Sequence, residues 1–322
     1  MTDPLPTPPA SAPPPAVGAM LVRELPPEDL TAVAHDLAAH VDELWVVEDC
    51  FYAGGVAQAA AVLEAVPDVV VGHGIAPAPF RNPAALAMEW ATLARRHPGR
   101  LIGGVGHGVG EWMDQIGARP TSPLALLDET ITAVRALLRG ERVDVDGRYV
   151  RLRDVELRFP PPALPPVLAG VRRPRSLQLA GRVADGVILA EWTSPAGVRA
   201  ALDHVRAGRA AGGPSGPPEV VVFCAFRLDD ERAAADVLRP VAEESLRWPD
   251  PPLACWPDGP PTGADAEALL RDGAAVGGPD TVRQRIDELA AAGAHHIVLT
   301  PWGPDPADQL ARLAATVLAH RR

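Results

Sequence analysis

The sequence predicts an α/β chain folded as a (β/α)8 TIM barrel with insertions, and three observations lead to this class. A β-rich run, a loop and a helical stretch follow one another eight times along the chain. Runs such as residues 221–226, "VVFCAF", are apolar on both faces, which is typical of a parallel sheet covered by helices. The 322 residues suit a barrel of roughly 250 residues with added segments. A doubly wound open sheet is the alternative.

The eight units can be taken in order along the chain. We expect strands at residues 16–22, 43–49, 68–75, 100–106, 165–171, 185–191, 219–228 and 295–303, each followed by a helix. Residues 1–15 are expected to be a disordered Pro-rich tail, and residues 16–322 a single barrel domain. Two segments are longer than the connections need. In 140–166 apolar residues alternate around a "DG" pair, which predicts a small β excursion. The segment 247–278 is long enough to form a lid.

The composition excludes several classes of function. The net charge of −11 argues against nucleic-acid and anionic-membrane partners. The chain contains no lysine, so Schiff-base catalysis, a pyridoxal-phosphate lysine and a phosphate-loop lysine are excluded. Three cysteines are widely scattered without zinc spacing, and no apolar run has the length of a membrane span. We therefore expect a cytoplasmic protein that binds a small-molecule substrate.

The stretch "RLIGGVGHGVGEWM", residues 100–113, combines a strand end with five glycines around His107. Glycine permits positive φ and a close approach of the backbone to a ligand. The spacing does not match the G-x-G-x-x-G dinucleotide turn. We interpret the glycines as a floor from which side chains are removed so that a wide, flat ring can lie against it.

Acids and imidazoles follow several predicted strands. In a barrel the active site lies at the C-terminal ends of the strands. Strand ends two to four place Glu48, Asp49, His73 and His107 at one rim, and strand six ends in Glu191. Taken singly, each histidine is more often a hydrogen-bonded core residue, and each acid a helix cap or salt-bridge partner. Their coincidence on one rim favours a functional site.

The segment "GVRRPRSLQLAGR" places arginines where a strand gives way to a helix. Pro174 stands where a helix can begin, and Arg172, Arg173 and Arg175 cluster around it. Helix N-termini bind phosphate through free N–H groups, and arginine adds bidentate charge. By itself the segment fits an exposed basic loop as well as a phosphate site.

Four stretches together resemble the luciferase-like oxidoreductases, which include flavin-dependent monooxygenases and coenzyme F420 (deazaflavin)-dependent enzymes. They are "ELWVVEDCFYAGG", the run from "GHGIAPAPFRNPA" through "PGRLIGGVGHGVG", "PPVLAGVRRPRSLQLAGRVADGVILAE" and "GGPDTVRQRIDELAAAGAHHIVLTPWG". The resemblance spans about residues 16 to 303 in the same order. It implies a TIM barrel with an insertion, often as a homodimer.

The resemblance also implies roles for particular residues. Gly74 and Ile75 match a bulge that backs the cofactor ring through a non-prolyl cis peptide in the deazaflavin branch. Gly106, His107 and Gly108 match the loop that contacts the ring or its ribityl chain. The cofactor phosphate loop is matched by Gly170, Val171, Arg172, Arg173, Pro174, Arg175 and Ser176. Glu48–Asp49 matches an Asp-His pair, with Asp49 replacing the histidine, and Val109 replaces a frequent acid after the glycine loop.

These arguments lead to one expected function with several alternatives. We expect F420-dependent hydride transfer to or from a small organic substrate, with Asp49, His73 and His107 as candidate acid–base groups and Glu48 in support. Extra arginine in the phosphate loop and the small residues Gly72 and Gly74 favour the deazaflavin over FMN. A side chain at Gly74 is expected to enter the ring site. The alternatives are an FMN-dependent monooxygenase, a cofactor-binding protein without turnover, and a metal-dependent hydrolase using Glu48, His73, His107 and Glu191.

Overall fold

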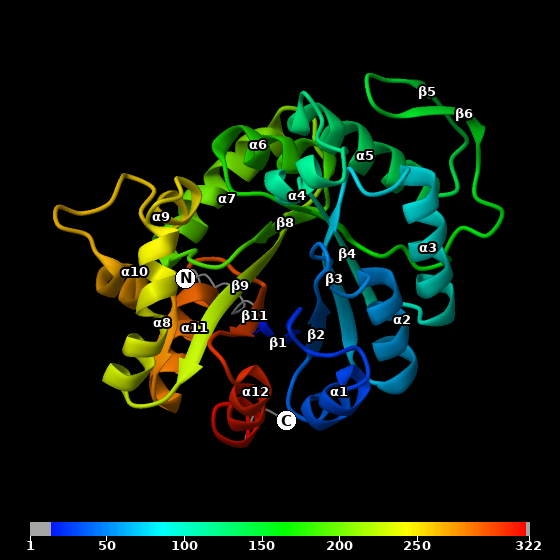
Figure 1. Ribbon diagram of the computed structural model, residues 1–322. Coiled ribbons are helices and arrows are strands. Elements are labelled where there is room, and N and C mark those ends of the chain that lie inside the picture. The colour runs from blue at the N-terminus through cyan, green and yellow to red at the C-terminus, as the bar shows by residue number, and fades with distance from the viewer. Residues whose placement is uncertain (1–13, 320–322) are drawn as a thin grey trace, which may run out of the picture.

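The computed structural model describes residues 14–319, and its centre is a closed barrel of eight parallel strands (Figure 1). Each strand pairs with the next, and β9 pairs with both β8 and β11, while β11 pairs with β1. The ring is therefore closed, which excludes the open sheet. The barrel strands are β1 (Ala16–Leu21), β2 (Glu43–Val46), β3 (Val70–Pro77), β4 (Leu101–Gly106), β7 (Val167–Gly170), β8 (Gly186–Leu189), β9 (Glu219–Leu228) and β11 (His296–Pro301).

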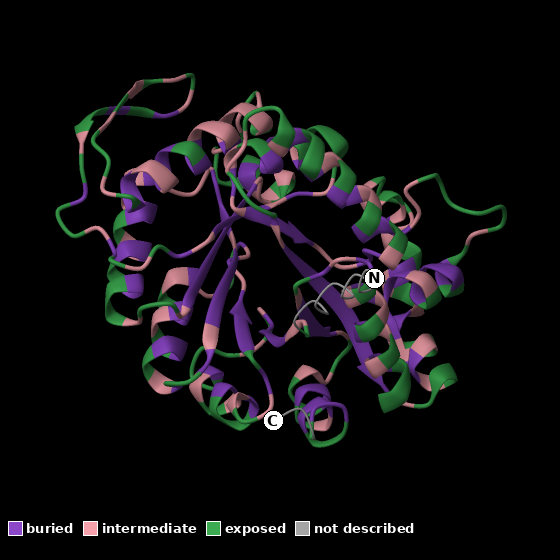
Figure 2. Cartoon of the chain, turned by 180° about the vertical axis from the view of Figure 1, so that it is seen from behind, coloured by how far each residue is buried: buried purple, intermediate pink, exposed green. Residues whose placement is uncertain are grey.

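Helices surround this barrel, and their inner faces bury its outer wall (Figure 2). The strands are buried almost throughout, whereas the helices expose one side. The long helices are α1 (Leu30–Ala38), α2 (Gly55–Ala65), α3 (Pro83–Arg96), α5 (Pro123–Leu138), α6 (Pro174–Val183), α7 (Pro195–Ala210), α8 (Glu231–Ser245), α11 (Pro279–Ala291) and α12 (Pro306–Thr316).

Three of these helices begin with the same local device, which the sequence carries openly. A polar residue precedes a proline at Asn82–Pro83, Ser122–Pro123 and Ser194–Pro195. The side chain of the first residue accepts a hydrogen bond from an N–H of the first turn. Proline supplies a preset φ where its missing N–H costs nothing.

The interior of the barrel is filled by side chains. Trp45 and Phe223 pack edge to face with ring centroids 5.4 Å apart. A Cβ at Gly72 would lie 2.1 Å from Trp45 Cδ2, so the glycine leaves the space that the indole fills. The barrel is thus a packed core rather than a pore, and a ligand can only bind at its ends.

The two added segments are built differently. In 140–166 a hairpin of β5 (Val143–Asp146) and β6 (Arg151–Val155) projects beyond α5 (Figure 1). In 247–278 the chain forms α9 (Asp250–Cys255), α10 (Ala266–Gly273) and β10 (Ala275–Gly277), which pairs with the C-terminal end of β9.

Some boundaries differ from those that the sequence predicts. β2 ends at Val46, so Glu48 and Asp49 lie in the loop after it. A short helix, α4 (Gly110–Gln115), follows the glycine loop and was not expected. The predicted tail lies almost wholly outside the described residues. No helix within 14–319 is both long and apolar enough to cross a membrane.

Candidate functional site

A cavity of about 410 Å³ lies at the C-terminal ends of β2, β3, β4, β7 and β8, and we call it the first cavity. Such a volume falls within the range of small-molecule sites. Most of the residues expected to bind a cofactor line it. They are Gly74, Ile75, His107, Gly108, Gly170, Val171, Arg172, Arg173 and Ser176, and Glu48 and Asp49 line it as well.

The glycines near this cavity surround a side chain rather than a bare surface. A Cβ at Gly106 would lie 2.9 Å from Ile75 Cδ1, and a Cβ at Gly170 would lie 2.6 Å from Ile75 Cγ2. At Gly104 the Ile75 Cγ2 atom would be 3.0 Å away. The interpretation of an empty glycine floor is therefore wrong. Ile75 occupies that space and forms the wall against which a ring could lie.

The peptide bond between Gly74 and Ile75 is cis, as the resemblance implies, and so is the bond between Cys50 and Phe51. The expected effect of a side chain at Gly74 needs correction. Its Cβ would point into the barrel, 2.6 Å from Phe223 Cζ and 2.8 Å from Trp45 Cε3. A larger residue there would disturb the core before it reached the cavity.

Glu48 is buried and held by several partners. Arg81 donates two hydrogen bonds to its carboxylate, at 2.8 and 2.6 Å, and the Gly55 N–H donates another at 3.1 Å. Burial alone would raise the pKa of Glu48, but His73 and Arg81 together lower it to about 2. The carboxylate is thus ionised at neutral pH and suited to a fixed negative charge rather than a proton donor.

His73 lies behind the cavity wall, not at its surface. It is fully buried, its Nδ1 accepts from Trp90 Nε1 at 3.3 Å, and its Nε2 is 3.6 Å from Glu48 Oε2. It does not line the first cavity. The structure therefore does not bring His73 together with the other candidate acid–base groups, and its contacts are those of a residue that positions Glu48.

Asp49 and Arg23 form the rim beside Glu48. Arg23 Nη1 donates to Asp49 Oδ2 at 2.9 Å, and its guanidinium lies 5.1 Å from the Tyr52 ring and 5.8 Å from the Trp112 ring. Burial raises the pKa of Asp49, against the opposing effect of Arg23. A raised pKa favours the protonated form of a carboxyl, so Asp49 is better suited to hold a proton than an exposed aspartate.

The N-terminus of α6 closes the opposite side of the first cavity. No side chain caps this helix, so its first N–H groups are open to an anion. Arg172 and Arg173 line the cavity beside it, whereas Pro174 and Arg175 are exposed and do not. His107 Nε2 lies 3.3 Å from Ser176 Oγ, and burial, aided by Arg173, lowers the pKa of His107, which favours its neutral form.

Several residues at this site were missed or read differently. Arg23 follows β1 as Glu48 follows β2, so the strand-end rule could have found it. Trp112 lies on the unexpected helix α4. Asp250 reaches the cavity from the 247–278 segment and accepts from Arg173 Nε at 2.7 Å, with no signal in the sequence. Glu191, expected at the end of the sixth strand and given a role only as a metal ligand, lines the cavity too, and burial raises its pKa.

The metal-hydrolase alternative needs a cluster of ligands. Within residues 14–319 no three His, Cys, Asp or Glu side chains gather closely enough to hold a metal ion. His73 is separated from the cavity, and Glu48 is already bound by Arg81. The arrangement of these side chains therefore does not support that alternative.

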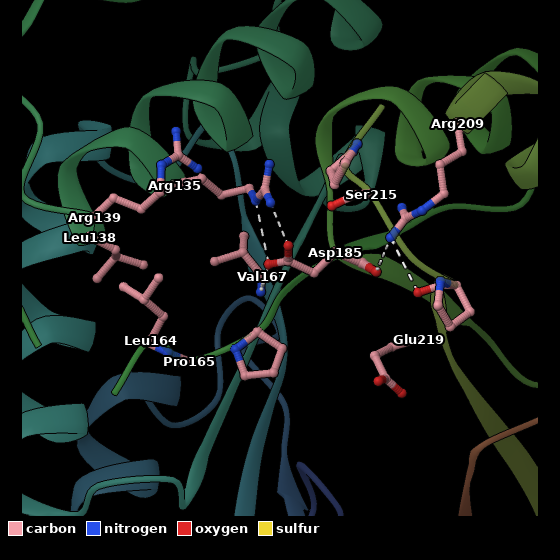
Figure 3. A pocket seen from close by; sticks show the side chains of 13 residues that line it. Arg135, Leu138, Arg139, Leu164, Pro165, Val167, Asp185, Arg209, Ser215 and Glu219 are labelled. Atoms are coloured by element: carbon pink, nitrogen blue, oxygen red, sulfur yellow. Dashed lines mark hydrogen bonds and ion pairs between the residues drawn. The ribbon is translucent and has the colours of Figure 1, made fainter. Parts of the chain in front are cut away.

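Another cavity, of about 330 Å³, opens at the amino ends of β7, β8 and β9 (Figure 3). Arg135 binds the Asp185 carboxylate, and Asp185 also accepts from the Val167 N–H at 2.8 Å. Arg209 donates to the carbonyls of Ala184, Asp185, Gly216 and Pro217. The charged groups here are occupied with one another and with the backbone. This end of a barrel usually serves stability.

A closed (β/α)8 barrel with an uncapped helix end beside arginines and an acidic rim is the class that the fold and site define. Comparison with known proteins makes this specific. The family model for luciferase-like monooxygenases matches residues 17–296. The chain therefore belongs to the luciferase-like monooxygenase family, whose members are oxidoreductases.

Individual relatives agree with this placement. The chain is 27% identical over 259 residues to a 5,10-methylenetetrahydromethanopterin reductase from Methanolobus tindarius, covering 74% of this chain and 79% of the relative. It is 33% identical over 179 residues to an F420-dependent glucose-6-phosphate dehydrogenase from Mycobacterium avium (strain 104), covering 50% and 53%. A solved F420-dependent secondary alcohol dehydrogenase in complex with an F420-acetone adduct superposes with a TM-score of 0.81 at 20% identity, covering 96% of this chain and 100% of that one.

Proposed function

We propose that the protein is a coenzyme F420-dependent oxidoreductase that transfers hydride to or from a small organic substrate. The observation that carries this is the first cavity, which joins a wall suited to a flat ring to a site suited to a phosphate. Ile75 forms the wall. Arg172, Arg173 and the open end of α6 form the phosphate side. Relatives whose names include F420 support the choice of cofactor.

The residues present fit such a cofactor. An anionic phosphate would find uncapped helix N–H groups and the Arg172 guanidinium at α6, beside Arg173, whose Nε already donates to Asp250. The chain supplies these groups without any lysine. His107, neutral because burial lowers its pKa, is available as a hydrogen-bond partner along the same wall. When bound, the deazaflavin supplies the hydride chemistry, and the protein supplies position and protons.

Asp49 is the side chain we assign to proton transfer. It lines the first cavity, and burial raises its pKa, which favours the protonated form and suits the carboxyl to accept and donate a proton there. Glu48, with a pKa of about 2, stays charged beside it and is fixed by Arg81. His107 remains a second candidate at the cavity, whereas His73 acts through Glu48.

Titration of the purified chain with F420 and with FMN, at matched salt, tests the proposal. We expect F420 to bind more tightly, with a change in its absorbance or fluorescence. Tighter binding of FMN, with oxygen consumption on reduction, would instead establish the monooxygenase alternative. Binding of F420 with no turnover across a substrate panel would favour the cofactor-binding protein. The expected homodimer and cytoplasmic location stay predictions.

A further inference from the structure

A second cavity of about 380 Å³ lies against the first at the C-terminal end of the barrel. Val47, Asp49 and Glu191 line both cavities. If the first cavity holds the cofactor, as proposed above, the second is where a substrate can meet its reacting edge. The chemistry of the second cavity then decides which substrates are accepted.

The charges that line the second cavity are mostly negative. Glu24, Asp49 and Glu191 face it with carboxylates, and Arg23 is the one cation among its lining residues. Arg23 is already engaged, since its Nε donates to Glu24 at 2.8 Å and its Nη1 to Asp49 at 2.9 Å. An incoming anion would therefore find no free cation among these residues and at least one carboxyl group that no cation holds by a hydrogen bond.

Glu191 is that group, and the residue after it has an unusual backbone conformation. The closest cation to Glu191 is Arg172, whose Nη2 is 4.0 Å from Glu191 Oε2, beyond hydrogen-bond distance. The next residue, Trp192, has a φ of +70°, which a bulky side chain rarely adopts. Trp192 is kept there by packing edge to face on Trp302 at 5.1 Å and by the close approach of Gly273 in α10. Strain retained in this way is common at functional sites.

An unused hydrogen-bonding group lines the same cavity. Thr300, which lies in β11, is only 5% exposed, and its hydroxyl has no hydrogen-bond partner within the described part of the chain. Buried polar groups are normally paired, so an exception of this kind needs a ligand or a water molecule. The remaining wall is largely apolar, from Met20, Val22, Val241, Pro301 and Trp302.

We propose that the second cavity binds substrates through a cationic nitrogen group, an amine or an iminium, and excludes phosphate and carboxylate groups. Glu191 and Asp49 attract the cation, Thr300 contributes a hydrogen bond, and the apolar wall receives the hydrocarbon part. A bound cation also favours the ionised form of both carboxyls, which offsets the effect of their burial.

Three probes of one size and three charges test this on the full chain at low salt. They are cyclohexylammonium, cyclohexanol and cyclohexanecarboxylate, titrated by saturation-transfer NMR. We expect the ammonium to bind at least tenfold more tightly than the carboxylate, with the alcohol between them. Glu191→Gln should narrow the ammonium-to-carboxylate ratio severalfold, because one unit charge near the ligand is removed.

Two further variants keep the test decisive. Glu156→Gln, at the exposed residue that follows β6, is the matched control and should leave the ratio unchanged. Asp49→Asn replaces Glu191→Gln if the latter fails to fold. Carboxylate binding as tight as ammonium binding, or a ratio insensitive to both cavity variants, would overturn the inference. F420 binding by the same preparations is measured separately. If F420 does not bind but the preference for ammonium over carboxylate is present, only the cofactor proposal is contradicted. If F420 binds but that preference is absent, only the proposal for the second cavity is contradicted.

Discussion

The two ends of the barrel contain similar residue types but use them in opposite ways. At the amino end His296 lies between Glu43 and Glu219, which raise its pKa to about 9 against the opposing effect of burial. Asp185 and Arg209 there have partners at nearly every polar atom. At the carboxyl end Glu191 is 4.0 Å from its nearest cation, and the Thr300 hydroxyl has no partner within residues 14–319.

The difference between the two ends indicates which buried charged groups can take part in binding a ligand. Both ends bury charge, which is costly unless the groups are paired and hydrogen-bonded. At the amino end the charged groups are paired with one another and with the backbone, so few of their hydrogen-bonding positions are available to a ligand. At the carboxyl end, by contrast, a buried hydroxyl has no hydrogen-bond partner among the described residues, and burial raises the pKa values of two carboxyl groups, Asp49 and Glu191. Pairing, rather than charge alone, separates a stabilising cluster from a binding site.

The largest expected effect follows from removing the titrating group of Asp49 at the carboxyl end. Asp49→Asn keeps the size of the side chain, and we expect turnover to fall by about 10² to 10⁴, the typical contribution of a general acid or base. The affinity for F420 should stay within a few fold. Steady-state kinetics with a confirmed substrate and a cofactor titration measure the two effects.

Asp114→Asn, on the exposed face of α4, is the matched control for this substitution. An unchanged rate in Asp49→Asn would move the acid–base role to His107 or Glu191. Substitution of each by Gln would then decide between them.

Glu48 tests whether a paired group at the carboxyl end behaves like those at the amino end. Its pKa is lowered to about 2 from 4.5, so its stabilising effect is full above pH 4.5 and is lost as pH falls through 2. Glu48→Gln should lower the free energy of unfolding at pH 7 by about 3 kcal/mol and flatten the acid dependence between pH 5 and 2. Urea unfolding at several pH values measures this. An equal acid slope in both proteins would contradict the assignment.

Two arginines near the start of α6 allow a cavity-lining side chain to be compared with an exposed one in the same segment. Arg172 lines the first cavity, whereas Arg175 is exposed and is not among the residues that line it. Charge-assisted hydrogen bonds are worth about 1.5–3 kcal/mol, so Arg172→Ala should weaken cofactor binding roughly tenfold to a hundredfold. Arg175→Ala should change it less than about twofold, since an exposed arginine is screened by solvent. Equal losses in both variants would mean that the phosphate lies farther along the helix.

The amino end supplies the smallest expected effect. Asp185→Asn removes the charge that Arg135 binds while keeping a side chain that can accept from Val167. We expect a loss of about 1–2 kcal/mol in unfolding free energy, because the pair is partly exposed. Cofactor affinity should be unaffected. A clear change in that affinity would show that the two ends are coupled.

Much of the barrel could be predicted because its signals are local. Short windows of sequence show the alternation of strands and helices and the strands that are apolar on both faces. They also show the polar residue before a proline where three helices begin, at Asn82, Ser122 and Ser194. The strand-end rule also located Asp49, Arg172 and Arg173 at the first cavity, but Arg175 does not line it. The closed ring and the luciferase-like family were both predicted and confirmed.

The rest depends on contacts between segments far apart in the chain. Nothing local shows that Trp90 and Glu48 enclose His73, or that Asp250 reaches Arg173 across 77 residues. The glycines were visible, but the side chain that fills their space belongs to the neighbouring strand β3. A pattern of small residues records that something approaches closely, without saying whether it is a ligand or the protein itself.

The effect of a substitution at a glycine beside Ile75 therefore depends on which residue occupies position 75. Gly104, Gly106 and Gly170, on β4 and β7, each leave less than a normal contact distance to this one side chain. A methyl group added at Gly106 or Gly170 collides mainly with Ile75, so a smaller residue at position 75 should make it more tolerable. At Gly104 the methyl would also lie 2.5 Å from Ile188 Cδ1 and 2.9 Å from the His73 carbonyl oxygen, so that site stays blocked. Effects of substitutions at these four positions should be strongly non-additive. At Gly106 and Gly170 the shape of the first cavity's wall can therefore be altered only after Ile75 has been replaced by a smaller residue.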